Sequence, residues 1–574
     1  MAAASQENPG QCFVSWICPF PLGLCLSFSV PSFSVISVDY PPNPAMQPLN
    51  TSYDAVVIGS GHNGLVAAAY LAMAGRSVLV LEKAADFGGA TTSKRVFPGH
   101  DALLSRYAYL VSLFPQTITA ELGLDFQTRR RRIASFTPWT DAAGRERGLV
   151  LSNEDEGRSR DSMREMTGSD AAWDRYQQLL ALQTAFAKIA WPSLLEPVVS
   201  RESFRARFRT AEEQAAWRAF VERPLGEVLE AYADHDALRG LLLTDGKIGV
   251  FADAHHASLL QNRCFLYHVI GNETGEWRVP VGGMRSVPEA LLRRCRALGV
   301  TLAAESPAVR IETGPVRHRV HFESAGIERS VEATHVLVNA GPRAFARLLG
   351  ETWQPGPEDE GSAVKINMLL RRLPRLKAAG IDPKDAFAGS FHIDEGYAQM
   401  QASFEAARAG RLPDPAPGEI YCHTLTDDSI LSPELRAQGY QTLTLFGLDM
   451  PWRLFPAEQN DARREEVARL YLAGLDRLCA EPFADCLARD EGGRLCLELK
   501  TPRDLQDEMD LDQGNIFHNA LSWFFTDDAA EVGTWGVETH HPRILRAGSS
   551  AFRGGAVSGV PGRNAAFAAL GRRS

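Results

Sequence analysis

Residues 53–92 read YDAVVIGSGHNGLVAAAYLAMAGRSVLVLEKAADFGGATT, and this stretch decides the fold. Residues 53–58 form an apolar run rich in β-branched side chains, which is typical of a buried parallel strand. A G-x-G-x-x-G turn follows, and then come a helix expected over residues 65–74 and a second apolar strand over residues 77–81. The order of strand, glycine turn, helix and strand predicts the first unit of a parallel α/β sheet.

The glycine turn predicts a site for the adenosine diphosphate half of a dinucleotide. Gly59 permits the tight turn, Gly61 lets the backbone approach a pyrophosphate, and Gly64 lets the helix pack close to the strand. The predicted site includes Ser60 and Asn63, because both stand inside the turn. The N-terminus of the helix would face the pyrophosphate. The alternative is a glycine-rich turn that binds nothing.

An acid and a second glycine pair follow the second strand. Glu82 lies about 20 residues beyond the glycines, where an acid accepts hydrogen bonds from ribose hydroxyls. Lys83 comes next, and Gly88, Gly89 and Thr91 then form a G-G-x-[ST] turn. An acid followed by such a turn resembles the opening of the FAD-dependent amine oxidase and phytoene desaturase superfamily. The predicted cofactor is therefore FAD rather than NAD.

A second glycine-rich run lies near the C-terminus, at residues 545–566, LRAGSSAFRGGAVSGVPGRNAA. Gly554, Gly555 and Gly559 leave backbone uncovered where a flat ring could approach. Pro561 suits the first turn of a helix, and a helix N-terminus would stabilise negative charge on a reduced flavin. This run contains no Cys or His, so FAD is predicted to be noncovalent.

The two glycine motifs, with VPVGGM at residues 279–284 and GNIFH at residues 514–518, resemble the phytoene desaturase-related oxidoreductases. The resemblance covers residues 50–574 and implies an α/β fold, with a Rossmann-like FAD-binding domain built from discontinuous segments and an α+β substrate domain. By position, the resemblance places Gly283 and Met284 near the ring, Val309 at the adenine, and Gly548, Gly555 and Val557 along the ribityl chain and ring. The chain departs from its relatives at Phe552 and Arg553, where they carry His-Pro.

At 574 residues the chain is too long for one ordinary core. We predict an FAD-binding domain from residues 51–140, 255–345 and 526–574, and a substrate domain from residues 141–254 and 346–525. Residues 141–250 are expected to be mostly helical, because Trp173, Tyr176, Leu179, Leu180 and Leu182 recur at helical spacing.

The first 45 residues contain no Lys or Arg, and prolines interrupt their apolar stretch. Neither a secretory signal nor a mitochondrial presequence fits this composition. We predict that Met46 is the true start and that residues 1–50 are a disordered or mis-assigned extension. A membrane-touching tail is the alternative.

Charge and cysteine usage exclude several classes of function. A formal net charge of −10 argues against a nucleic-acid partner. Nine cysteines are scattered along the chain and none forms C-x-x-C, so neither a dithiol redox centre nor a metal site is predicted. Scattered cysteines fit a reducing cytoplasm.

Only one G-x-G-x-x-G occurs, so a pyridine nucleotide is not expected to be the reductant. We predict an FAD-dependent oxidoreductase that removes hydride from an apolar or amine-bearing small molecule, with oxygen, a quinone or another electron acceptor. The sequence assigns no catalytic residue. Lys365, His392, His423 and His518 are candidates only because they fall in the predicted substrate domain.

Two other functions stay open. One is a carotenoid (phytoene) desaturase or isomerase at a membrane surface, with weak membrane association. The other is a non-catalytic binding or regulatory protein with the FAD fold, although an intact Glu82 and Gly88-Gly89 pair argue against it. The oligomeric state is not predicted.

Overall fold

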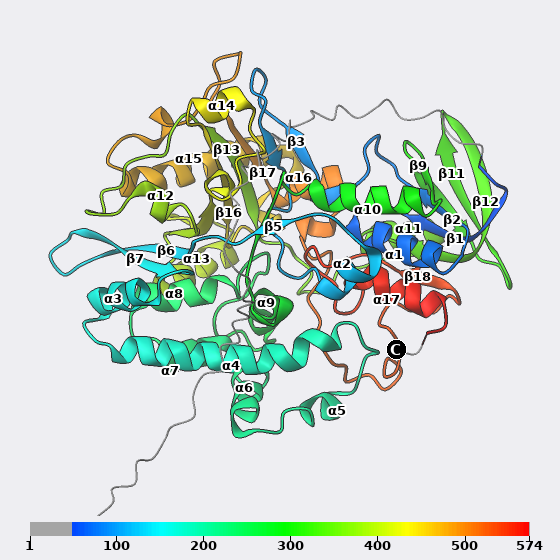
Figure 1. Cartoon of the computed structure of the whole chain (residues 1–574), viewed down its shortest axis with the longest axis horizontal. Coiled ribbons are helices and arrows are strands. Elements are labelled where there is room, and N and C mark those ends of the chain that lie inside the picture. The colour runs from blue at the N-terminus through cyan, green and yellow to red at the C-terminus, as the bar shows by residue number, and fades with distance from the viewer. Residues whose placement is uncertain (1–48, 573–574) are drawn as a thin grey trace, which may run out of the picture. The chain divides into compact units, whose positions relative to one another are not determined.

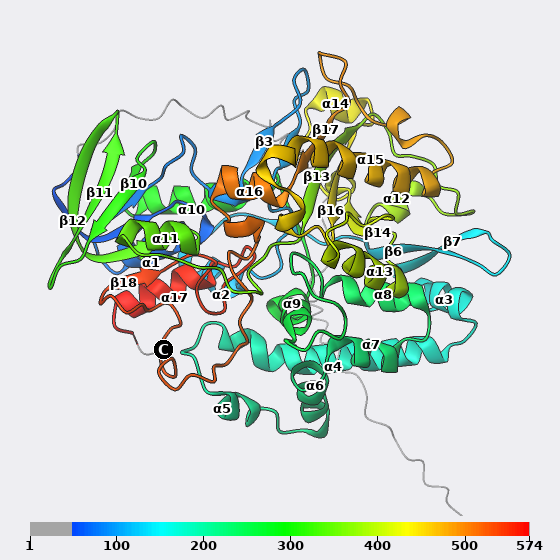
Figure 2. The same ribbon diagram turned by 180° about the vertical axis from the view of Figure 1, so that it is seen from behind.

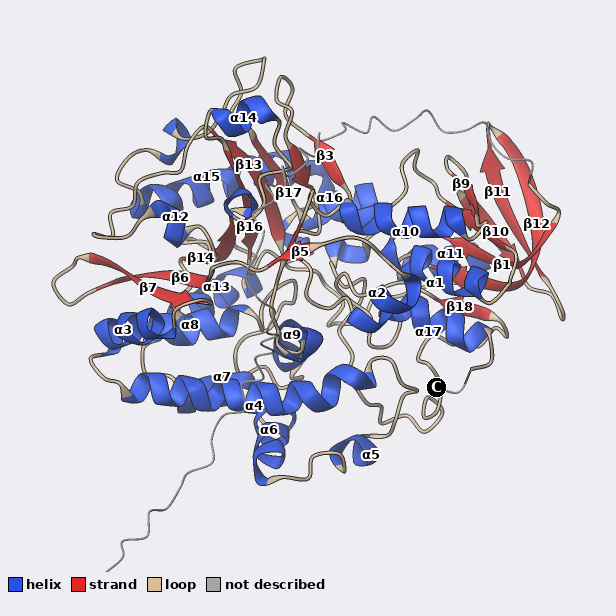
Figure 3. Ribbon diagram, viewed as in Figure 1, coloured by secondary structure: helices blue, strands red, loops and turns tan. Residues whose placement is uncertain are grey.

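The computed structural model describes residues 49–572. Met46 and most of the predicted N-terminal extension lie outside the described residues. This part of the chain contains two seven-stranded sheets and a group of helices (Figure 3).

The first sheet contains the strand predicted from residues 53–58. Its order is β10-β11-β12-β1-β2-β9, with β18 paired to β12 (Figure 1). The bounds are β1 Ser52–Ile58, β2 Val78–Leu81, β9 Thr301–Ala303, β10 Ala308–Glu312, β11 His318–Ser324, β12 Ile327–Val338 and β18 Ile544–Arg546. Strands β18, β12, β1, β2 and β9 are parallel, whereas β10, β11 and β12 are antiparallel. The predicted Rossmann-like α/β fold is confirmed.

Both faces of this sheet are covered, which explains the continuous apolar run of β1. Val57 points into a core shared with α1 (His62–Met73), α10 (Ser286–Ala297) and α17 (Val560–Ala569). Val56 points to the opposite core, where Phe345 of α11 (Pro342–Leu349) packs. Figure 2 shows α11 from behind, on the other side of the sheet from α10. Alternate residues of β1 therefore serve two separate helix layers.

The second sheet has the order β17-β13-β16-β15-β14-β6-β7. The bounds are β6 Ile133–Thr140, β7 Glu146–Ser152, β13 Val364–Leu370, β14 Ser390–Ile393, β15 Gly418–Tyr421, β16 Gln441–Gly447 and β17 Leu497–Lys500. All its pairs are antiparallel except β14 with β6. Strand β6 belongs to this sheet, although the predicted boundary at residue 140 assigned it to the FAD-binding segments. The division into two domains stays a prediction.

Residues 156–270 supply most of the remaining helices: α3 Glu156–Thr167, α4 Ala171–Ser193, α5 Arg201–Arg205, α6 Ala211–Val221, α7 Leu225–Tyr232, α8 Asp236–Thr244 and α9 Leu260–Val269. Trp173, Leu179 and Leu182 of α4 are buried in their common core. Among the helices of residues 49–572, none is long and apolar enough to cross a membrane.

Shorter elements connect these layers. The helices are α2 Gln116–Leu122, α12 Pro383–Ala386, α13 Tyr397–Arg408, α14 Pro433–Ala437, α15 Asn460–Leu478 and α16 Pro502–Met509, and the two small sheets pair β3 Ser93–Arg95 with β4 Leu103–Ser105 and β5 Thr128–Arg129 with β8 Val279–Pro280. Helix α15 packs against the second sheet through Val467, Tyr471 and Leu475.

Candidate functional site

Asn339, directly after β12, closes the turn between β1 and α1. Its Nδ2 donates to the carbonyl oxygen of Gly59 at 3.2 Å. Gly59 has a φ of +92°, which favours glycine, and an added Cβ there would lie 2.4 Å from the carbonyl oxygen of Asn339. A Cβ on Gly64 would lie 2.2 Å from the carbonyl oxygen of Gly59. The sequence did not reveal this role of Asn339, because the contact depends on β12 lying beside β1.

The N-terminus of α1 is free to bind an anion. Gly61 is its N-cap, no side chain among residues 49–572 caps the helix, and its first turn contains no acidic residue. The first N–H groups of the helix therefore remain as donors, and the helix dipole favours negative charge there. Asn63 is buried in this turn and donates to Ser549 Oγ at 3.3 Å, while its Oδ1 has no hydrogen-bond partner within the described chain.

Glu82, directly after β2, links the two N-terminal glycine motifs. Its Oε2 accepts hydrogen bonds from Ser60 N at 2.9 Å and Ser60 Oγ at 2.6 Å, and its Oε1 accepts one from Ala84 N at 2.9 Å. Ser60 Oγ in turn accepts one from Gly88 N at 3.2 Å. A carboxylate offers about four acceptor positions, so one position remains for a ribose hydroxyl.

The second glycine pair packs on the first motif. Gly61 and Gly88 form a parallel bridge, and a Cβ on Gly89 would lie 3.2 Å from Gly61 Cα. Thr91 is buried, and its Oγ1 donates to the carbonyl oxygen of Gly88 at 2.6 Å. Lys83, unlike Gly88, Gly89 and Thr91, points to the surface, where its half-exposed ammonium pairs with Asp510. The turn around Gly88 thus lies against the N-terminus of α1.

The C-terminal glycine run reaches the same place. Gly562 of α17 lies so close to α1 that a Cβ there would be 2.0 Å from the carbonyl oxygen of Asn63. A Cβ on Gly548 would lie 2.9 Å from Asn339 Oδ1. Segments almost 500 residues apart in sequence therefore meet at the carboxyl ends of the parallel strands, where ligands of such sheets bind.

Gly555 and Val557 lie on the other side of this run. Gly555 has a φ of +105°, and an added Cβ would lie 2.9 Å from Leu521 and 3.2 Å from Phe517. Val557 is buried in the core shared with α1 and α17. The backbone at Gly555 therefore faces the loop that contains the GNIFH motif.

Arg553, one of the two residues that replace the expected His-Pro, has a structural role. Its side chain is 2% exposed, and Nη1 and Nη2 donate to the carbonyl oxygens of Ser193 at 2.5 Å and Glu196 at 2.8 Å. Burial lowers the pKa of Arg553 to about 10. The guanidinium therefore anchors the C-terminal glycine run to the end of α4.

The remaining predicted cofactor-binding residues, Gly283, Met284 and Val309, lie in different environments. A Cβ on Gly283, which has a φ of +79°, would lie 2.9 Å from Ser93 Oγ. Met284 is fully buried under α10, and its N–H donates to Ser105 Oγ at 3.1 Å. Val309 is 38% exposed at a bulge of β10. Just before it, Ser306 N donates to the carbonyl oxygen of Glu82 at 2.8 Å, which places the start of β10 beside the acid.

Two histidines meet beside the first glycine motif. Burial lowers the pKa of His62 to about 3 and that of His518 to about 4, and His518 also lowers the pKa of His62. His62 Nε2 and His518 Nδ1 are buried without a hydrogen-bond partner among residues 49–572. Both imidazoles are therefore neutral, and one ring nitrogen of each is left for a ligand or water.

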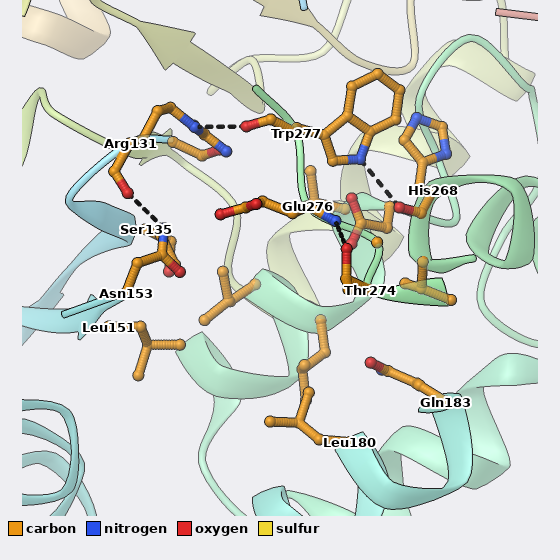
Figure 4. Close-up of a pocket in the computed structure, with 18 of the residues that line it drawn as sticks. Arg131, Ser135, Leu151, Asn153, Leu180, Gln183, His268, Thr274, Glu276 and Trp277 are labelled. Atoms are coloured by element: carbon orange, nitrogen blue, oxygen red, sulfur yellow. Dashed lines mark hydrogen bonds between the residues drawn. The ribbon is translucent and has the colours of Figure 1, made fainter. Parts of the chain in front are cut away.

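A cavity of 470 Å³ lies between the second sheet and the helices α4, α8 and α9 (Figure 4). Leu180 and Gln183 line it from α4, and Arg131, His268 and Trp277 line it from the opposite side in Figure 4. The volume suits a small molecule. The ring of His268, which lines the cavity, lies 6.5 Å from that of Phe517, and an added Cβ on Gly555 would lie 3.2 Å from Phe517.

Acidic groups that sequence reasoning missed line this cavity. Asp245 follows α8, and Glu419 lies on β15 directly opposite His392 of β14. Burial and the charge of Glu395 raise the pKa of Glu419 to about 7, and burial also raises the pKa of Asp245. No signal in the four-residue strand β15 indicated Glu419, because only the pairing of β14 with β15 shows which groups face it.

His392 belongs to the same cluster. Its Nδ1 pairs with Glu395 Oε2, and its Nε2 has no hydrogen-bond partner in the described structure. Burial opposes the charged imidazolium, but Glu395, Glu419 and Asp245 outweigh it and raise the pKa of His392. His392 and Glu395 therefore form an ion pair whose charges cancel.

Tyr109 connects this cavity to Lys365 and His423. Its hydroxyl donates to Glu419 Oε1 at 3.3 Å, and the Nζ of Lys365 lies 5.2 Å from its ring centre. Lys365 Nζ donates to the carbonyl oxygens of Ser105 at 2.5 Å and Tyr107 at 2.7 Å, and burial lowers its pKa well below the usual value. Burial lowers the pKa of His423 to about 3.

Comparison with known proteins agrees with this architecture. Residues 57–120 match the family model described as an NAD(P)-binding Rossmann-like domain. The Mycobacterium tuberculosis protein Rv0897c is 44% identical over 528 residues, which cover 90% of this chain and 97% of that protein. The chain belongs to the family of Rv0897c.

One further relative and one solved structure carry names that state a class of protein. Rat pyridine nucleotide-disulfide oxidoreductase domain-containing protein 2 is 28% identical over 563 residues, covering 90% of this chain and 93% of the rat protein. This homology agrees with the oxidoreductase class that the glycine motifs imply. A crystal structure of an oxidoreductase from Methanosarcina mazei shares the fold, with a TM-score of 0.50, 14% identity, and coverage of 90% of this chain and 99% of that one.

Proposed function

We propose that this protein is an FAD-dependent oxidoreductase that oxidises a small molecule, with FAD bound noncovalently. The observation that carries the proposal is the network of Glu82, Ser60 and Gly88 at the uncapped N-terminus of α1. It combines a pyrophosphate-binding helix end with a ribose-binding carboxylate.

The second and third glycine motifs favour FAD over NAD. Gly88 and Gly89 pack on Gly61, and α17 packs on α1, so three separate segments frame one elongated site. A lone nucleotide turn would not need them. On this proposal the ADP half lies at Gly59, Ser60, Gly61, Asn63, Gly64, Glu82, Lys83, Gly88, Gly89, Thr91 and Val309, and the flavin half lies at Gly283, Met284, Gly548, Gly555 and Val557.

FAD, when bound, supplies an acceptor for the hydride of a C–H bond. The chain's own residues would bind and orient the substrate in the cavity beside His268 and would exclude water from it. Oxygen, a quinone or another molecule would accept the electrons. We also propose a cytoplasmic location, supported by six buried free cysteines in the described part of the chain.

Carotenoid desaturation remains the second candidate through the resemblance, but the cavity does not favour it. Arg131, Asp245, Glu419 and His392 line the space, whereas a polyene would require an apolar lining. A non-catalytic role is disfavoured by the intact arrangement around Glu82.

Anaerobic reduction tests the proposal. FAD-loaded protein is mixed with amines, polyenes and lipids in separate reactions, and the flavin absorbance near 450 nm is followed. We expect bleaching by a member of the panel, and no bleaching by NADPH at about 1 per second or faster, the usual range of turnover. Fast bleaching by NADPH would show that a pyridine nucleotide is the reductant. A protein that takes up no FAD would refute the proposal.

A further inference from the structure

The cavity contains more negative charge than its hydrogen bonds satisfy. Glu419 is 3% exposed, and its hydrogen-bond donors among the described residues are neutral hydroxyls: Tyr109 donates to it at 3.3 Å, and Tyr421 also hydrogen-bonds to it. Asp245 accepts no hydrogen bond and forms no ion pair within residues 49–572, although it lines the same cavity. An acidic group that lines a cavity without a cationic partner is costly to ionise, so this arrangement indicates a cation that is supplied from outside the chain.

The cationic groups nearby are already engaged. Arg130 pairs with Glu276, and His392 pairs with Glu395. Arg131 Nη1 donates to Ser390 Oγ at 3.2 Å and its Nε donates to the carbonyl oxygen of Trp277 at 3.3 Å. Within the described chain, no cationic side chain lies within 4.0 Å of Asp245 or Glu419.

Aromatic rings stand beside the two carboxylates. Tyr109, Tyr176, Tyr421 and Trp277 line the cavity, and the rings of Tyr109 and Tyr421 lie 5.0 Å apart. The faces of such rings attract cations, and their edges provide apolar area for the rest of a ligand.

We propose that this cavity binds a protonated primary or secondary amine, with its ammonium group held between Asp245 and Glu419 against the rings of Tyr109 and Tyr421. The inference rests on the proposed function, because it names the class of substrate, but it depends on different residues. It narrows the apolar or amine-bearing substrate of the sequence prediction to a cation.

Binding of a cation has a proton signature. Glu419 faces His392 on β14, Glu395 after β14, Asp245 after α8, Tyr109, and Tyr421 on its own strand. Burial and Glu395 raise its pKa to about 7, so at neutral pH much of it is protonated. A cation beside it stabilises the carboxylate and lowers that pKa, and the complex therefore releases a proton.

Calorimetry with matched probes tests this proposal. FAD-loaded protein is titrated at pH 7 with propylammonium, hexylammonium and 2-phenylethylammonium, and separately with 2-phenylethanol, which has a similar shape without the charge. We expect at least one ammonium probe to bind about tenfold or more tightly than the alcohol, since hydrogen bonds to charged groups are the stronger ones. Titration in phosphate and in Tris buffer then measures the proton released.

Three variants locate the site. Asp245→Asn and Glu419→Gln should each weaken the ammonium probe about tenfold or more and leave 2-phenylethanol unchanged, and Glu419→Gln should also abolish proton release. Glu273→Gln is the matched control, because it removes a charge from an exposed residue of the same cavity lining and should change neither. Melting temperatures establish that each variant is folded. Since the two test variants act independently, one that fails to fold leaves the other to decide.

Equal binding of ammonium and alcohol, no binding of any ammonium probe, or unchanged affinity in the folded variants would overturn the proposal. These outcomes are distinct from a failure of the proposed function. A protein that binds FAD but no ammonium probe refutes only the amine site, whereas a protein that binds the probe but no FAD refutes only the flavoenzyme.

Discussion

Replacing Gly64 with alanine tests the contact on which the nucleotide site depends. A Cβ at this position would lie 2.2 Å from the carbonyl oxygen of Gly59 and 2.9 Å from Asn339 Nδ2. Real Cβ atoms stay at least 3.0 Å from such neighbours. The backbone of β1 and the first turn of α1 must therefore separate by about 0.8 Å, because neither neighbour is the end of a long flexible side chain.

Overpacking of this kind costs about 1–3 kcal/mol. In a unit of this size, that free energy lowers the melting temperature by only a few degrees. Cofactor retention should change more, because the displaced N–H groups are those that would hold the pyrophosphate, and binding geometry tolerates an error of about 0.5 Å. We expect Gly64→Ala to fold and to lose most of its FAD.

The matched control is Gly157→Ala near the start of α3, where an added Cβ meets only Asp155 Oδ1 at 3.4 Å. Alanine is favoured over glycine in helices by about 0.5–1 kcal/mol, so this variant should melt at or slightly above the temperature of the parent and keep its FAD. FAD content after gel filtration and the melting temperature are measured for both variants. Full FAD content and an unchanged melting temperature in Gly64→Ala would refute the reasoning.

Three further changes have defined outcomes. Glu82→Gln places an amide N–H against a backbone N–H of Ser60 or Ala84, so the Kd for FAD, measured by fluorescence titration of apoprotein, should rise about tenfold or more; an unchanged Kd would contradict the role of the carboxylate. Arg553→Leu leaves the carbonyl oxygen of Glu196 unpaired, at about 1–3 kcal/mol, and leaves that of Ser193 with only the N–H of Glu196, so it should lower the melting temperature by a few degrees; equal melting would show that the anchor is dispensable. Glu419→Gln should stabilise the fold more at pH 8 than at pH 5. The buried Glu419 carboxyl costs the fold nothing while it is protonated, below its pKa in the unfolded chain, and this stability is lost as pH rises through its folded pKa of about 7, whereas Gln stays neutral; a difference in melting temperature that is independent of pH would contradict the raised pKa.

The nucleotide half of the fold could be predicted because its signals are local. The run at residues 53–58, the glycines and Glu82 follow one another within 30 residues, and each has a position-specific physical role. Helix α1 and strand β2 likewise overlap the runs predicted at residues 65–74 and 77–81. Local periodicity is sufficient for such elements.

The cavity could not be predicted in this way, because its lining comes from segments that are distant in the sequence. Tyr109, Arg131, Asp245, His392 and Glu419 become neighbours only through the pairing of β6, β14 and β15 and the packing of α8. No spacing in the sequence encodes these pairings. The role of Asn339 was missed for the same reason, whereas Lys365, chosen only for its place in the chain, does lie beside Tyr109.

The central claim is that this chain binds FAD noncovalently, and the most direct measurement is the FAD released from purified protein by acid precipitation. We predict a yellow protein whose supernatant contains FAD at a ratio near one per chain. Gly61→Val should release none, because its side chain would cover the N–H groups at the start of α1. A colourless protein that takes up no FAD on incubation, or a flavin that stays with the precipitate, would contradict the account.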